Sequence, residues 1–188
     1  PLNAKLINKG KKPVTGIWPY GQGKIPSYPS FKNTHGLTGG IITAVDLLKG
    51  IGKLAGLKTP NIKGATGFID TNYQEKINAA FDILNKHDFC YIHIEAPDEC
   101  GHMGNPHLKK KAIEDFDEKI IKPILDYSNK NEDVYILILP DHPTPCELKT
   151  HTNKPVPFIL FHKNSKTIST LPYNENTGKQ TNIYFNSG

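Results

Sequence analysis

Residues 88–104, "DFCYIHIEAPDECGHMG", change from an apolar strand-like run to a polar turn. The first part, "DFCYIHIEA" (88–96), has the length and the apolar content of a buried β-strand. Asp98 and His102 follow four positions apart, so in a helical turn their side chains would lie on one face. The stretch therefore predicts a buried strand that ends in a polar site.

Strands and helices alternate on both sides of this stretch. The predicted elements are a strand at 14–20, a strand running into a helix over 39–57, a helix at 73–87, the strand at 88–96, a helix at about 107–128, and strands at 133–142 and 156–162. The last two strands are continuously apolar, which is typical of strands buried on both faces of a parallel sheet. This alternation predicts an α/β fold, a three-layer αβα sandwich with a mostly parallel sheet.

Two further polar groups lie close to the predicted strand ends. Asp141 and His142 end the strand "YILIL", and His151 precedes the last strand. In such folds the ligand site lies at the carboxyl ends of the strands. Carboxylate oxygens and imidazole nitrogens together suit Zn²⁺, Mn²⁺ or a related divalent ion. Taken singly, Asp141 could be a capping aspartate, and His142 and His151 could be surface histidines. The joint appearance of these residues with Asp98 and His102 favours a metal site.

Composition limits the classes of partner. The chain has 188 residues, of which 37% are hydrophobic, and a net charge of +5, so it can bury one substantial core. The lysines are scattered without an aromatic and basic stripe, which argues against a nucleic-acid partner. No segment approaches the ~20 apolar residues of a membrane span. The 3 cysteines lack paired spacing, so we expect reduced thiols in a cytoplasmic protein.

Three motifs resemble one family of enzymes. They are "HIEAPDECGHMG" (93–104), "LPDHPTP" (139–145) and "KTHTNKPVPFIL" (149–160). Together they resemble the cofactor-independent phosphoglycerate mutases, most closely the archaeal-type branch within the alkaline phosphatase superfamily. The stretches "GIWPYGQGK", "AVDLLKGIGKLAGL" and "GATGFIDTNY" are similar to the same branch. The resemblance implies part of an alkaline phosphatase-like core.

The resemblance also implies a centre of two divalent metal ions, Mn²⁺, Zn²⁺ or Mg²⁺. By motif match, Asp98, His102 and His151 would hold one ion, and Asp141 and His142 would help to hold the second. In the family the second ion also takes an aspartate and a serine from an amino-terminal segment, and that serine is the nucleophile. The matching motifs here do not include that segment, so we expect the catalytic serine to lie outside this chain.

The family places a cap domain between two halves of the core. Residues 1–13 would then be a linker, or the exit from a missing cap domain, and residues 14–188 the carboxyl-terminal part of the core. Because the chain starts without methionine and ends in the strand-like "TNIYFNSG", we expect cuts at both ends and a missing amino-terminal half as partner. Lys24 and Lys49 match positions where the family presents cations to a small phosphorylated substrate.

The activity implied is the interconversion of 3-phosphoglycerate and 2-phosphoglycerate through a phosphoserine. A related phosphotransferase such as a homoserine kinase-like enzyme, a phosphatase or phosphodiesterase, and a non-catalytic metal-binding half-domain remain alternatives. The metal ligands cannot choose between the enzymes because the superfamily shares them. The acceptor is set by the cap, which this chain would lack.

Overall fold

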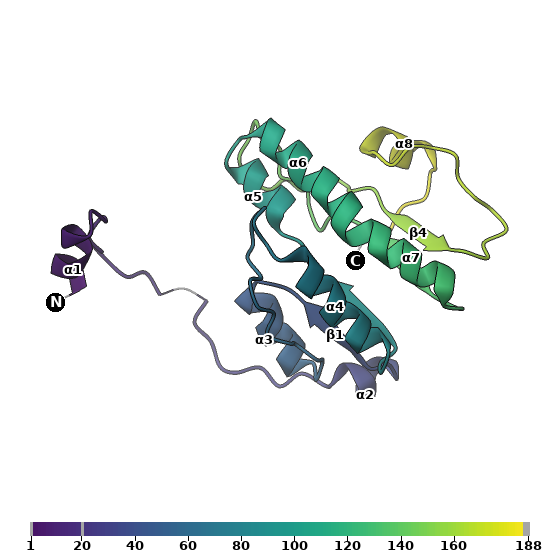
Figure 1. The fold of residues 1–188 in the computed structure, drawn as a ribbon, viewed down its shortest axis with the longest axis horizontal. Coiled ribbons are helices and arrows are strands. Elements are labelled where there is room, and N and C mark those ends of the chain that lie inside the picture. Colours follow the sequence, from purple (N-terminus) through teal and green to yellow (C-terminus); the bar gives the residue numbers. More distant parts are fainter. Residues whose placement is uncertain (1, 20, 186–188) are drawn as a thin grey trace.

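The structure, a computed structural model, describes residues 2–19 and 21–185, which contain both helices and strands (Figure 1). The helices are α1 (Leu2–Asn8), α2 (Phe31–His35), α3 (Asp46–Leu54), α4 (Tyr73–Leu84), α5 (Ala96–His102), α6 (Pro106–Phe116), the π-helical turn η1 (Asp117–Ile121), α7 (Lys122–Lys130) and α8 (Glu175–Gln180). The strands are β1 (Gly39–Ile42), β2 (Phe89–Ile92), β3 (Tyr135–Ile138) and β4 (Ile159–His162). The predicted α/β content is confirmed.

β1 and β2 form a parallel pair, with Gly39 opposite Phe89 and Ile42 opposite Ile92. The chain between them passes through α3 and α4, as a parallel connection requires. The strand predicted at 88–96 is shorter than expected, because β1 offers only four residues for pairing. The last bond of the pair runs from the amide of His93 to the carbonyl of Ile42, at 2.8 Å. Beyond it the chain is free to turn into α5.

Three apolar clusters fix the helices around this pair. One joins β1 to α4, the second joins α4 to η1, and the third joins α5 to α6. Their buried members are Ile42, Ile62, Ala80 and Ile83; Tyr73, Ile77 and Ile120; and Ala96, Cys100 and Ala112. The third cluster matters most for the site, because it seats α5 through its apolar face and leaves the other face to polar side chains.

The helix predicted at about 107–128 is a continuous helical run from Pro106 to Lys130 with one π-helical turn inside it. In that turn the amide of Lys122 donates to the carbonyl of Asp117, five residues earlier. Pro123 follows directly and has no amide hydrogen to continue the ladder. A π-helical turn just before a proline is one way in which a helix absorbs that loss. The turn keeps Ile120 buried, at 1% exposure.

The last two strands differ from the prediction. β3 and β4 pair antiparallel, with Tyr135 opposite His162 and Ile138 opposite Ile159, in a sheet separate from β1 and β2. The chain between them forms no helix to serve as a crossover, so it simply reverses direction. Burial on both faces was also wrong, because Leu137 and Leu160 are 59% and 63% exposed. One face of this pair is therefore apolar and open.

The ends of the chain also depart from expectation. Residues 14–19 form no strand, and Tyr20, the last residue of that prediction, lies outside the described residues. α1 stands apart from the other helices at the end of an extended segment (Figure 1). Residues 181–185 are not a strand, and 186–188 lie outside the described residues. None of the helices within the described ranges is both long and apolar enough to cross a membrane.

Candidate metal centre

Asp98, His102 and His151 converge on one point. A ligand atom of each side chain lies within 4.8 Å of the other two. The Nε2 atoms of His102 and His151 are 3.0 Å apart, and these atoms lie 3.2 and 3.4 Å from the carboxylate oxygens of Asp98. Donors about 2.1 Å from a tetrahedral Zn²⁺ would be roughly 3.4 Å apart. The geometry and the donor types therefore fit a divalent ion.

The local structure explains why these side chains meet. α5 begins next to Pro97, which suits the first turn of a helix because it lacks an amide hydrogen. The helix brings Asp98 and His102 onto one face, as the sequence predicted. The Nδ1 atom of His102 lies 3.0 Å from the carbonyl oxygen of Lys149, which can only accept. Nδ1 therefore carries the proton, and Nε2 is left free to bind an ion.

Asp141 and His142 lie beside this group. The rings of His142 and His151 have centroids 3.7 Å apart, and Nδ1 of His142 is 4.0 Å from Oδ1 of Asp98. Nε2 of His142 lies 3.2 Å from Oδ2 of Asp141, a spacing that one shared ion would allow. The side chain of Asp141 is 61% exposed, so this part of the centre is open. The structure thus groups Asp98, His102 and His151, places His142 against them, and leaves Asp141 in contact with His142 alone among the predicted ligands.

Sequence reasoning missed Thr144, which is only 3% exposed. Its hydroxyl donates to Oδ1 of Asp98 and lies 3.3 Å from Nδ1 of His142. Its carbonyl oxygen accepts from Nζ of Lys109 at 2.6 Å. The available signal was its position two residues after His142 in "PDHPTP", at the same strand end.

A second layer of polar groups follows the carboxyl ends of β1 and β2. His93 and Glu95 follow the end of β2, and Nδ1 of His93 is 3.3 Å from Oγ1 of Thr43. Burial lowers the pKa of His93. Burial also raises the pKa of Glu95, and nearby carboxylates raise it further. Lys76 is 1% exposed, and burial lowers its pKa to about 8 although Glu95 opposes the shift. The buried ammonium of Lys76 thus partly balances the negative charge of Glu95.

The predicted substrate lysines are not part of this group. Lys24 lies in an exposed segment without regular secondary structure. Lys49, on α3, pairs with Asp46 of the same helix at 3.3 Å. Among the contacts of the described residues, none joins Lys24 or Lys49 to the candidate ligands.

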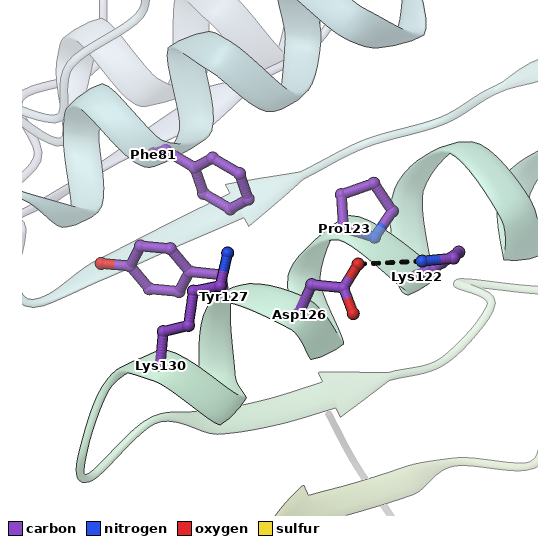
Figure 2. A pocket seen from close by; sticks show the side chains of 6 residues that line it. All are labelled: Phe81, Lys122, Pro123, Asp126, Tyr127 and Lys130. Carbon is purple, nitrogen blue, oxygen red and sulfur yellow. Dashed lines mark hydrogen bonds and ion pairs between the residues drawn. The ribbon is translucent and has the colours of Figure 1, made fainter.

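A separate surface hollow lies between α4 and α7 (Figure 2). Its volume is about 410 Å³, and its lining consists of Phe81, Lys122, Pro123, Asp126, Tyr127 and Lys130. Phe81 stacks on Tyr127 with ring centroids 4.7 Å apart, and Lys122 pairs with Asp126 at 2.9 Å. None of the predicted site residues lines this hollow, so it is distinct from the candidate metal centre.

The class of protein follows from comparison with known families. The chain belongs to the Metalloenzyme superfamily, whose family model matches residues 5–183. Two curated relatives, from Methanosarcina mazei and Methanosarcina barkeri, are named 2,3-bisphosphoglycerate-independent phosphoglycerate mutase. They are 49% and 43% identical over 162 and 185 residues, or 86% and 97% of this chain. The resemblance drawn from the three motifs is thereby confirmed.

Solved structures agree on the fold. A protein from Pyrococcus horikoshii has a TM-score of 0.83 at 30% identity, over 96% of this chain and 47% of its own. The cofactor-independent phosphoglycerate mutase of Thermoplasma acidophilum has a TM-score of 0.65 at 22% identity, over 97% of this chain and 42% of its own, and it supports the fold alone. The chain therefore has an alkaline phosphatase-like metalloenzyme fold. It spans about half the length of the curated relatives, 41% and 46% for the two Methanosarcina proteins.

Proposed function

We propose that this chain is the carboxyl-terminal part of an enzyme that interconverts 3-phosphoglycerate and 2-phosphoglycerate. The observation that carries the proposal is the convergence of Asp98, His102 and His151 within 4.8 Å, in a chain whose relatives bear that enzyme's name. The adjacent Asp141 and His142 extend this group toward a second ion. These residues supply the oxygen and nitrogen donors that Mn²⁺, Zn²⁺ or Mg²⁺ accept.

In this proposal Asp98, His102 and His151 hold one ion, and Asp141 and His142 contribute to the second. Two bound divalent ions supply acidity to a nearby hydroxyl and neutralise charge on a phosphoryl group in transfer. The protein's own part is orientation. The carbonyl of Lys149 fixes the proton on Nδ1 of His102, so that Nε2 faces His151 and Asp98.

The second site needs more donors than this chain supplies there. Asp141 and His142 offer two side chains, whereas an ion of this type binds at least four donors in all. We assign the remaining donors, and the serine that would carry the phosphoryl group, to the part of the relatives that this chain does not match. A covalent phosphoserine would divide one transfer into two easier steps.

The exposed apolar face of the strand pair supports a missing half. Tyr135, Leu137 and Leu160 are 68%, 59% and 63% exposed on β3 and β4. Neighbouring apolar side chains on one face of a sheet are usually covered by a second layer of secondary structure. We assign that layer to the remainder of the protein, which would complete a three-layer, mostly parallel sandwich. Residues 1–13 would connect to a cap domain, and residues 14–188 would belong to the core of a cytoplasmic protein.

Lys24 and Lys49 are the proposed cationic contacts to the phosphorylated substrate. Lys49 is partly buried and within reach of Asp46 alone among the acidic side chains of the described part, so its ammonium can exchange that exposed partner for a phosphate. Lys24 lies on an exposed segment, and its ammonium would contact a substrate held by the missing part.

The test is an assay of the full-length protein with Mn²⁺. ³¹P NMR would follow 3-phosphoglycerate, with chelator as the control, and 2-phosphoglycerate is the expected product. Release of inorganic phosphate without 2-phosphoglycerate would indicate a phosphatase. Phosphorylation of homoserine by ATP, with no mutase activity, would indicate the kinase-like alternative. Two bound ions without turnover of any of these substrates would favour a non-catalytic module.

A further inference from the structure

Thr144 contacts ligands of both proposed ions. Its hydroxyl donates to Oδ1 of Asp98, which belongs to the first set of ligands, and lies 3.3 Å from Nδ1 of His142, which belongs to the second. Asp98 and His142 approach each other to only 4.0 Å, so their direct contact is weak. Beside the direct contact of the His142 and His151 rings, the hydroxyl of Thr144 therefore links Asp98 to His142 more closely than these two side chains approach each other.

The position of Thr144 is fixed from several sides. The residue is 3% exposed, and its carbonyl oxygen accepts from Nζ of Lys109 on α6 at 2.6 Å. Gly101 on α5 lies directly against this residue. A Cβ atom at Gly101 would overlap the carbonyl oxygen of Thr144 and would lie 2.9 Å from its Cγ2. Thr144 is thus packed against the helix that carries Asp98 and His102. A hydroxyl held in this way has little freedom to choose other partners.

The hydrogen-bond roles follow from the number of protons. A hydroxyl has one proton, and the carboxylate of Asp98 can only accept, so Thr144 donates to Asp98. The oxygen of Thr144 then accepts from Nδ1 of His142. With its proton on Nδ1, His142 has a free lone pair on Nε2, the atom that lies 3.2 Å from Oδ2 of Asp141. Nε2 is therefore the nitrogen directed to the second ion.

We infer that Thr144 is a positioning residue that couples the two ion sites, by orienting Asp98 for the first ion and His142 for the second. The inference rests on the proposed two-ion centre and adds to it. Groups that orient metal ligands commonly change metal affinity by about 10–100-fold when they are removed. Loss of a ligand of one ion would weaken that ion, whereas loss of Thr144 weakens both.

The experiment measures binding of Mn²⁺ to the full-length protein by chelator competition, with elemental analysis for the number of ions. Thr144→Val keeps the shape and removes the hydroxyl, and we expect it to weaken both ions by about 10–100-fold. Thr144→Ser keeps the hydroxyl and retains both affinities. The matched control is Thr71→Val, which removes another buried hydroxyl, one that accepts from the amide of Thr66 at 3.0 Å. It leaves both ions bound.

A second readout does not depend on affinity. At saturating Zn²⁺, we expect ¹⁵N NMR to show slow exchange of the proton on Nδ1 of His142 in the wild type and in Thr144→Ser, and rapid exchange in Thr144→Val. Thr144→Ala serves the same purpose if the valine variant does not fold, as judged by metal-free unfolding.

The outcomes separate the inference from the proposed function. A wild type that binds no ion would overturn the two-ion proposal itself. A wild type that binds two ions, with Thr144→Val unchanged or weakened at one ion alone, would overturn the coupling role and leave the two-ion proposal standing.

Discussion

The Nε2 atoms of His102 and His151 lie 3.0 Å apart, although 49 residues separate them in the chain. His102 ends α5, and His151 lies in the connection between β3 and β4. With the proton of His102 held on Nδ1 by the carbonyl of Lys149, its Nε2 presents a lone pair toward His151. This arrangement suits two imidazoles that share a cation.

Replacing His102 with alanine should lower the bound metal by about one ion per molecule of full-length protein, because the first site keeps only two of its side chains. Elemental analysis after dialysis measures this change. His107→Ala is the matched control, since His107 is an exposed histidine on the neighbouring α6. Equal metal content in His102→Ala and the wild type would count against His102 as a ligand.

Asp141→Asn should weaken the second ion more than the first. The change removes the charge but preserves an oxygen, so the contact of Oδ1 with the amide of His142, now 3.0 Å, can persist. Mn²⁺ titration measures the affinities of the two ions. Thermal unfolding of the metal-free protein measures how much Asp141 contributes to stability by capping the turn at His142. If the stability of the metal-free protein falls while the affinities of both ions are retained, the Asp141 carboxylate caps the turn at His142 and is not a metal ligand.

Gly101→Ala should destabilise the protein by about 1–3 kcal/mol, because the new methyl group would overlap the carbonyl of Thr144. Gly50→Ala is the matched control on α3, where a methyl group meets no other atom within 4 Å. That change should raise stability by about 0.5–1 kcal/mol through helix propensity. Urea unfolding of both variants measures the difference. Similar effects of the two changes would refute the close packing of Thr144 on α5.

Lys76 should make the stability of the protein rise with pH in the alkaline range. Its pKa is about 8 in the folded protein and 10.5 when unfolded, so between these values the unfolded chain binds more protons. The free energy of unfolding therefore gains about 2 kcal/mol from pH 7 to pH 9.5 through this group. Other groups titrate there too, so the measurement compares urea unfolding of the wild type and Lys76→Met at both values.

In Lys76→Met this contribution disappears, and the rise from pH 7 to pH 9.5 should be smaller than in the wild type by about 2 kcal/mol. An identical pH response of the two proteins would show that Lys76 has an ordinary pKa.

Local sequence determined the elements that depend on local pattern. The apolar spacing identified α4 and the helical run from Pro106 to Lys130, and the Asp98 and His102 spacing identified the face of α5 that carries these two proposed ligands. Helical periodicity and i, i+4 proximity are set by the backbone itself, so residues close in sequence are enough to reveal them. The residue types proposed as ligands were visible for a similar reason, since donor chemistry belongs to the side chain.

Tertiary structure decided what depends on distant partners. A continuous apolar run does not state whether its neighbour runs parallel, and β3 and β4 are antiparallel because no helix crosses between them. β2 ends at Ile92 because β1 ends at Ile42, which no local pattern in residues 88–96 reveals. Thr144 is an ordinary threonine in the sequence. Only the approach of its loop to Gly101 of α5 places its hydroxyl between Asp98 and His142.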